Sequence, residues 1–381
     1  MAKNGFKNKL GIGILGVATG FLGFVFLYNN EERVSADAVI ETCLSRETSG
    51  QYDQATVPCY IQGIREIIKH EGIAAALRYA DDKIRKWSTF SITHVVMHEI
   101  GYAAGYETND FEKALSYIPK SSQHIEHYFH YDGYQHGVFM VLFRKKKDTS
   151  TIDTLIREAC PRAFETRPQL SDDMRVAIEQ CFHAVGHALM YAFDNDPFVA
   201  LPYCDSLSEG YMKKWCYFGV FMENSYLYSS FHNPEGARPY VTGNSMLPLC
   251  FKVDKKYRLE CAKFAGRAYL HVERGNWKGL FRECSSFAER KEREVCVGQG
   301  ARLFIPMFYE NDFKSMEAAC ENDTLYVKEV CLGEVGVGIR QGAAGIVNTE
   351  FPFCESITED MRESCKTTVE NMYVEYPPSL H

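Results

Sequence analysis

The stretch NWKGLFRECSSF, residues 276–287, decides the fold, because segments before and after it repeat its pattern. Asn276 is a residue type that caps helix N-termini, and apolar residues follow it at helical spacing as far as Cys284. A second helix with an apolar stripe is predicted from Glu289 to Phe308, with Cys296 near its start. Two helices joined by a tight connection therefore form one predicted unit.

The cysteines set the register of such units along the chain. The 14 cysteines fall into pairs of short separation and leave none over. The second members of the later pairs, from Cys216 to Cys365, recur at intervals of 45, 35, 35 and 34 residues, a period typical of stacked two-helix repeats. One cysteine lies near the end of a first helix and its partner near the start of the second, which predicts a disulfide within each unit. The predicted disulfides are Cys43–Cys59, Cys160–Cys181, Cys204–Cys216, Cys250–Cys261, Cys284–Cys296, Cys320–Cys331 and Cys354–Cys365.

The alternative use of these cysteines is metal binding by thiolates. Such sites usually contain C-x-x-C knuckles, and the sequence has none. Disulfides are therefore favoured. An even number of regularly spaced cysteines then indicates an oxidising compartment.

Two further units carry no cysteine but align on the same register. CFHAVGH, residues 181–187, matches VMHEIGY, residues 96–102, and YQHGVFM, residues 134–140. With these units included, about nine repeats extend to the C-terminal region. A glycine recurs five residues after the register point, as at Gly101 and Gly186, and predicts close helix packing. Such packing offsets the helix penalty of glycine, which is about 1 kcal/mol.

The repeat length and the helix-pair layout resemble Sel1-like and other tetratricopeptide-type repeats over most of the chain. The signature residues of those repeats are not matched, so the resemblance concerns architecture and names no single family. The predicted fold is all-α. It is an α-solenoid of about nine helix-turn-helix repeats, cross-linked by disulfides within the repeats and preceded by one N-terminal transmembrane helix.

Residues 10–28, LGIGILGVATGFLGFVFLY, carry no charge and follow a basic stretch. A helix of this length spans about 28 Å, close to the thickness of the bilayer core. Lysines before the span and Glu31 and Glu32 after it predict a cytoplasmic N-terminus, with the bulk of the chain periplasmic or extracellular. The alternative is a cleaved signal peptide and a secreted protein, because Val34-Ser35-Ala36 loosely resembles a cleavage site.

The expected organisation has five parts. They are a basic cytoplasmic tail (1–9), a signal-anchor helix (10–28), a linker (29–40), histidine-rich helical repeats with a metal site (41–228) and disulfide-cross-linked helical repeats (229–381). The formal net charge of −8 gives no support to nucleic-acid binding. A hydrophobic fraction of 46% with 13% aromatic residues can build a large core and argues against disorder.

Histidine occupies the same position, two residues after the register point, in three successive units. A second histidine or an aspartate lies one helical turn away in each unit, on the same helix face. Equivalent positions of adjacent repeats lie beside each other, so these pairs predict a metal site between facing helices. The predicted ligands are His94, His98, Asp132, His136, His183 and His187.

Six such groups exceed the three or four protein ligands of one zinc ion, so one or two metal ions are expected. Nitrogen and oxygen ligands suit zinc, iron or copper, and the spacing does not choose among them. Glu99 is a candidate general base beside His98, although the order H-x-x-x-H-E departs from the H-E-x-x-H of zinc peptidases. The site would support a metal-dependent hydrolase, or an oxidative enzyme if Tyr102 lies near a redox metal.

A different class of function is the alternative. A histidine on an apolar helix is commonly a core residue, and the chain would then be a non-enzymatic scaffold whose solenoid face binds a protein or peptide. A pH-sensing surface is a further alternative. His124, His127 and His130 are candidates for additional ligands, a proton shuttle or a plain polar loop. The sequence contains no P-loop, dinucleotide-binding motif or G-x-S-x-G elbow.

Overall fold

The chain divides into two compact units, Met1–Glu66 and Ile67–His381. The computed structural model describes residues 43, 56–84, 90–118, 125–145, 150, 152–156, 160, 174–207, 210–226, 245–309, 312–322, 324–340 and 352–375. The predicted tail, membrane span and linker (1–40) lie outside these residues. Among the residues described, no helix is both long and apolar enough to cross a membrane.

The regular elements of the described residues are all helices, so the all-α prediction is confirmed. The first group is α3 (Thr56–Glu71), α4 (Ile73–Tyr79), the π-helix η1 (Ala80–Ile84), α6 (Phe90–Thr108), α7 (Phe111–Leu115), α8 (Ile125–Lys145), α10 (Met174–Ala192), α11 (Pro197–Cys204) and α12 (Gly210–Tyr226). The second group is α13 (Leu247–Lys252), α14 (Lys255–Val272), α15 (Trp277–Ser285), α16 (Arg290–Tyr309), α17 (Phe313–Ala319), α18 (Leu325–Arg340), α19 (Pro352–Ser356) and α20 (Glu359–Glu375).

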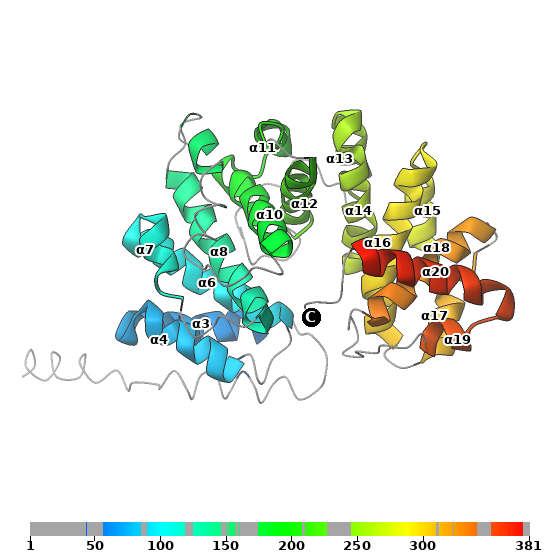
Figure 1. The fold of residues 1–381 in the computed structure, drawn as a ribbon, viewed down its shortest axis with the longest axis horizontal. Helices are drawn as coiled ribbons and strands as arrows, with labels where there is room; N and C mark the ends of the chain where they lie inside the picture. The colour runs from blue at the N-terminus through cyan, green and yellow to red at the C-terminus, as the bar shows by residue number, and fades with distance from the viewer. Residues whose placement is uncertain are drawn as a thin grey trace, which may run out of the picture. The chain divides into compact units, whose positions relative to one another are not determined.

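Short and long helices alternate through most of the unit Ile67–His381 (Figure 1). Each long helix packs against the next one, in the order α6, α8, α10, α12, α14, α16, α18 and α20. The short helices α7, α11, α13, α15, α17 and α19 each contact a neighbouring long helix. This succession agrees with the predicted pairing of helices. The superhelical path of a solenoid stays a prediction.

Side-chain caps explain where several short helices begin. The Asn276 carboxamide accepts a hydrogen bond from the Gly279 N–H at the start of α15, as the sequence predicts. Asp196 caps α11 in the same way, with Pro197 at the first helical position. Asp312 does so for α17. These caps fix the turn that separates each short helix from the long helix before it.

Seven disulfides join the cysteines in the predicted pairs and leave no free cysteine. Their Cα–Cα distances run from 5.4 Å to 5.8 Å, the range that disulfides require. Cys284 of α15 bonded to Cys296 of α16 shows the arrangement within one helix pair. A cross-link closing a loop of this size stabilises a fold by about 3 kcal/mol. The number of disulfides indicates an oxidising, extracytoplasmic environment.

Glycines bring the backbones of α6 and α8 into direct contact, and likewise those of α10 and α12. A Cβ atom on Gly101 would lie 2.1 Å from the carbonyl oxygen of Tyr134, and one on Gly186 would lie 2.2 Å from that of Cys216. No other residue type fits at these distances, so the packing role predicted for both glycines is confirmed. The close approach places side chains of α6 beside those of α8.

Candidate metal centre

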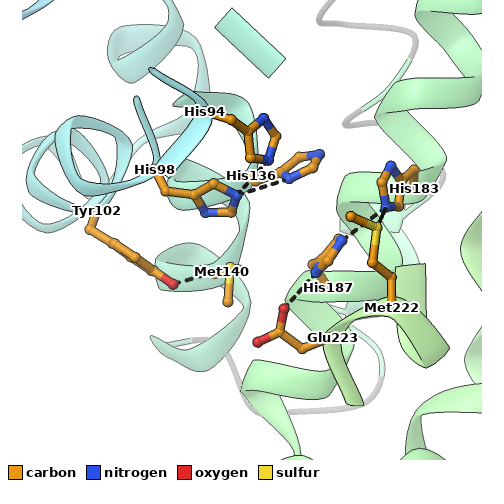
Figure 2. Close-up of polar contacts among 9 residues, drawn as sticks. All are labelled: His94, His98, Tyr102, His136, Met140, His183, His187, Met222 and Glu223. Atoms are coloured by element: carbon orange, nitrogen blue, oxygen red, sulfur yellow. Dashed lines mark hydrogen bonds and ion pairs between the residues drawn. The ribbon is translucent and has the colours of Figure 1, made fainter. Parts of the chain in front are cut away.

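Three histidines converge between α6 and α8. His94 and His98 lie one turn apart on α6, and His136 projects from α8. The Nε2 atom of His98 lies 3.2 Å from Nε2 of His94 and 3.1 Å from Nδ1 of His136. The three nitrogens all lie within 4.8 Å of one another, and Figure 2 shows the rings directed at a common point. We call these residues the histidine triad.

Hydrogen bonding alone does not explain the geometry of the triad. Both His94 and His136 approach the same nitrogen of His98. One imidazole nitrogen carries either one lone pair or one N–H, so it forms one good hydrogen bond at a time. A metal ion is shared by three nitrogens without this restriction. Tetrahedral zinc at 2.0–2.1 Å from each ligand requires nitrogen–nitrogen distances of about 3.3 Å. The two distances to His98 are close to this value, and the nitrogens of His94 and His136 lie within 4.8 Å of each other.

The triad is largely shielded from water but is open on one side. His98 is 2% exposed and His136 is 0% exposed, whereas His94 is only half-buried. A dry surrounding strengthens the interaction of a cation with its ligands. Three histidines fill three coordination positions and leave a fourth for water or substrate, the pattern of catalytic zinc sites.

The other two predicted histidines, His183 and His187 of α10, lie next to the triad. The ring centroid of His136 is 5.2 Å from that of His183 and 4.9 Å from that of His187. His183 and His187 face each other with their Nε2 atoms 2.9 Å apart. The repeat register therefore brings all five histidines into one cluster that spans three helices.

Two residues of α12 also belong to this site, and the sequence analysis missed them. Glu223 Oε2 lies 2.6 Å from Nδ1 of His187, and Met222 Sδ lies 3.1 Å from Nε2 of His183. Met222 holds the repeat position of His187 and Tyr102, six residues after the register point, so the alignment contained a signal for it. Glu223 comes one residue later, at a position that is also a glutamate, Glu66, in the unit of Cys59.

Two predicted site residues are not part of the described cluster. Asp132 lies in α8, but its side chain is outside the described residues, as are those of His127 and His130. Glu99 follows His98 directly, and neighbouring residues of a helix do not face the same way. Glu99 is half-buried, and its role as a general base stays a prediction.

Tyr102 lies beside the triad and stays a phenol at neutral pH. Its ring centroid is 6.2 Å from that of His98, and its hydroxyl donates a hydrogen bond to Met140 Sδ at 3.3 Å. Burial, and then the negative charge of Glu223, raises the pKa of Tyr102 well above its ordinary value. Tyr102 is therefore a hydrogen-bond donor or a redox-active group here, and not a base.

His183 is a neutral imidazole at neutral pH. Burial lowers its pKa well below the ordinary value, and the neighbouring rings of His187 and His136 lower it further. A neutral imidazole keeps one lone pair for a metal ion or a hydrogen bond. The site is therefore suited to accept a cation without first losing a proton from this residue.

No family model matches this chain, and no curated protein or solved structure matches it significantly. The fold and the site together define a disulfide-rich helical protein with a histidine triad that is able to hold a metal ion. The geometry of the site is therefore the basis for inferring its function.

Proposed function

We propose that the protein binds one transition metal ion through His94, His98 and His136 and uses the open coordination position for catalysis. The observation that carries this proposal is the approach of two imidazole nitrogens to the single Nε2 atom of His98. The two short nitrogen–nitrogen distances are compatible with zinc, and iron and copper also accept imidazole ligands.

Hydrolysis is the first candidate reaction. Zinc in such a site lowers the pKa of a bound water to about 7 and so supplies a nucleophile at neutral pH. His98 and His136 would hold the ion away from water, and the half-buried His94 marks the side from which a substrate would approach. Glu99 follows the ligand His98 directly but does not share its helix face, so its role as a general base stays a prediction from the sequence.

Metal content is the decisive measurement for this proposal. Full-length protein is stripped of metal, reloaded with zinc and measured by elemental analysis, beside His98→Ala and the control His70→Ala, which alters an exposed histidine of α3. We expect one zinc per chain in the wild type and in the control, and loss of this zinc in His98→Ala. Equal zinc content in all three proteins, or none in the wild type, would overturn the proposal.

Oxidative chemistry is a second candidate, and the position of Tyr102 favours it. The Tyr102 ring lies next to the ring of His98 and close to that of Tyr191, with centroids 5.9 Å apart. A redox metal in the triad would have an oxidisable side chain as neighbour. Oxidation of the copper- or iron-loaded protein should then give a tyrosyl radical in electron paramagnetic resonance that Tyr102→Phe removes. The zinc form should give no such signal.

A non-enzymatic scaffold is the third candidate, from a different class. Its support is the buried contact of Glu223 with His187, 2.6 Å between Oε2 and Nδ1, which is the kind of polar contact that orders a helical core. The helix pairs would then continue as a solenoid whose face binds a protein or peptide. This candidate requires that metal removal leave the denaturant midpoint of unfolding unchanged, whereas a bound metal ion raises it.

The proposed location is extracytoplasmic. The seven disulfides support it, and the apolar segment 10–28 would act as a membrane anchor, or as a signal peptide if it is cleaved. Cell fractionation of the full chain and of a variant without residues 10–28 tests this. The anchor requires full-length chain in the membrane fraction, and a cleaved signal requires a shortened soluble chain.

A further inference from the structure

A second group of ligand atoms lies beside the triad, and it contains a sulfur. His183 Nε2 is 2.9 Å from His187 Nε2 and 3.1 Å from the thioether sulfur of Met222. The nitrogens come from α10 and the sulfur from α12. Figure 2 shows the three side chains directed at one another.

Glu223 fixes the orientation of His187. Its carboxylate Oε2 lies 2.6 Å from Nδ1 of His187, and Glu223 is 0% exposed. A carboxylate on one ring nitrogen makes the other nitrogen a better metal ligand and sets its direction. The other nitrogen of His187 is Nε2, and it faces His183. This is the carboxylate–histidine arrangement that surrounds metal ions in proteins.

The surroundings of these ligand atoms are aromatic and nearly dry. The ring of His183 lies 5.2 Å from that of Phe218 and 6.3 Å from that of Trp215. His183 is 5% exposed, and Met222 is half-buried, so an ion would reach the site past the methionine. A low-charge ion with a preference for soft ligands suits such a pocket better than a hydrated divalent ion.

We propose that His183, His187 and Met222 form a second metal site, selective for Cu(I), with Glu223 as the residue that positions His187. Thioether sulfur selects Cu(I) over zinc, and imidazole serves either ion. The His183 and His187 nitrogens would move apart by a few tenths of an ångström to admit the ion, since metal-bound nitrogens stand about 3.3 Å apart. The second site uses none of the triad ligands, so failure of one proposal would not contradict the other.

The test uses metal-free full-length protein, titrated with Cu(I) without oxygen in competition with a coloured Cu(I) chelator. X-ray absorption at the copper edge then reports whether sulfur is bound. We expect copper–sulfur scattering in the wild type, its loss in Met222→Leu, and weaker Cu(I) binding in that variant. Met316→Leu, at a fully buried methionine of α17, is the matched control and should behave as the wild type.

Two further variants separate this site from the triad and from misfolding. Glu223→Gln keeps the shape of the side chain but not the charge, and we expect Cu(I) affinity to fall by about 10–100-fold with unchanged helical circular dichroism. His98→Ala should lose zinc but keep sulfur-bound Cu(I). The proposal is overturned if the wild type shows no copper–sulfur scattering, or if Met222→Leu and Glu223→Gln bind Cu(I) as tightly as the wild type.

Discussion

The ring of His136 stacks on the ring of His187, with centroids 4.9 Å apart and planes 28° apart. His136 belongs to the triad and projects from α8, whereas His187 projects from α10 and contacts Glu223 of α12. The contact joins the triad to the second group of ligands. A substitution of His136 should therefore affect both the triad and the second group of ligands. A substitution of His94 should affect the triad alone.

Replacement of His136 should consequently have wider effects than replacement of His94. His136→Ala removes a triad ligand and leaves a cavity against His187, so we expect loss of zinc and a stability cost of about 1–3 kcal/mol. His94→Ala should also weaken zinc binding but cost less than about 1 kcal/mol, because His94 is half-buried. Urea unfolding of the metal-free proteins gives both stability values. Equal costs would mean that the stacking contact is not formed.

The spacing of α6 and α8 should depend on Gly101. A Cβ atom there would lie 2.1 Å from the backbone oxygen of Tyr134, so Gly101→Ala must push the helices apart. We expect a loss of at least about 2 kcal/mol and weaker zinc binding, because His98 and His136 separate. Urea unfolding and zinc titration measure the two effects.

Gly210→Ala is the matched control for that experiment. Gly210 begins α12, and a Cβ atom there would meet nothing within 4 Å. Alanine favours the helix, so stability should stay the same or rise by up to about 1 kcal/mol. If both alanine variants unfold alike, the close approach at Gly101 does not determine the helix spacing.

The histidine cluster could be predicted from the sequence because aligning the repeats places histidines that are far apart in the chain at equivalent positions. His98, His136 and His183 hold one repeat position, and the structure places their rings side by side. The caps and disulfides were predictable for the same reason, since each depends on a short stretch of chain. Short sequence patterns recur from unit to unit, and their alignment indicates which side chains of neighbouring units lie close together.

Other contacts could not be predicted, because they depend on the rotation of one helix against the next. Glu223 reaches His187 across the α10–α12 interface, and the repeat position it shares with Glu66 does not indicate this contact. The division into a triad and a sulfur-containing group likewise depends on side-chain rotamers.

The disulfide nearest the cluster should influence metal binding, and a distant one should not. Cys181 precedes His183 by two residues on α10 and is bonded to Cys160. Replacing both Cys160 and Cys181 by serine should cost about 2–5 kcal/mol and weaken zinc and Cu(I) binding, because α10 loses the cross-link next to His183. Urea unfolding and metal titration of the double variant measure these effects.

The comparison is the pair Cys320–Cys331, which joins α17 to α18. Its replacement by serines should cost a similar free energy of unfolding, because the sequence separations of 11 and 21 residues change the loop-closure entropy by only about 0.6 kcal/mol. Metal affinity should be unchanged, because neither helix contributes to the histidine cluster. A drop in affinity in both double variants would point to general loosening of the fold.

Asp205 should stabilise the contact of α11 and α12 with α14 over the pH range in which its carboxylate is charged and its tyrosine partners are neutral. Its carboxylate accepts hydrogen bonds from Tyr217, from Tyr257 at 2.5 Å and from Lys256 at 2.7 Å. Partial burial by itself raises the pKa of Asp205, but these bonds outweigh it and hold the pKa below the ordinary 3.8. Burial, and then the bond to Asp205, raises the pKa of Tyr257 to about 12.

The pKa of Asp205 is lowered and that of Tyr257 is raised, and together they set the pH range in which this network stabilises the fold. The carboxylate contribution is present above the unfolded pKa of 3.8 and is lost as the pH falls through the lower folded value. The phenol contribution of Tyr257 is present below the unfolded pKa of 10.0 and is lost as the pH rises through about 12. The network should therefore stabilise the protein fully between about pH 4 and pH 10.

Asp205→Asn should cost about 1–2 kcal/mol at neutral pH, a value reduced because the carboxylate is partly exposed. The difference from the wild type should be smaller at about pH 3, because the contribution of the carboxylate is lost as the pH falls below the ordinary pKa of 3.8 and through the lower folded value. Asp254→Asn is the control, since Asp254 caps α14 and asparagine caps a helix equally well. Urea unfolding at both pH values measures the difference. A cost for Asp205→Asn that does not change with pH would show that the charge of the carboxylate plays no part.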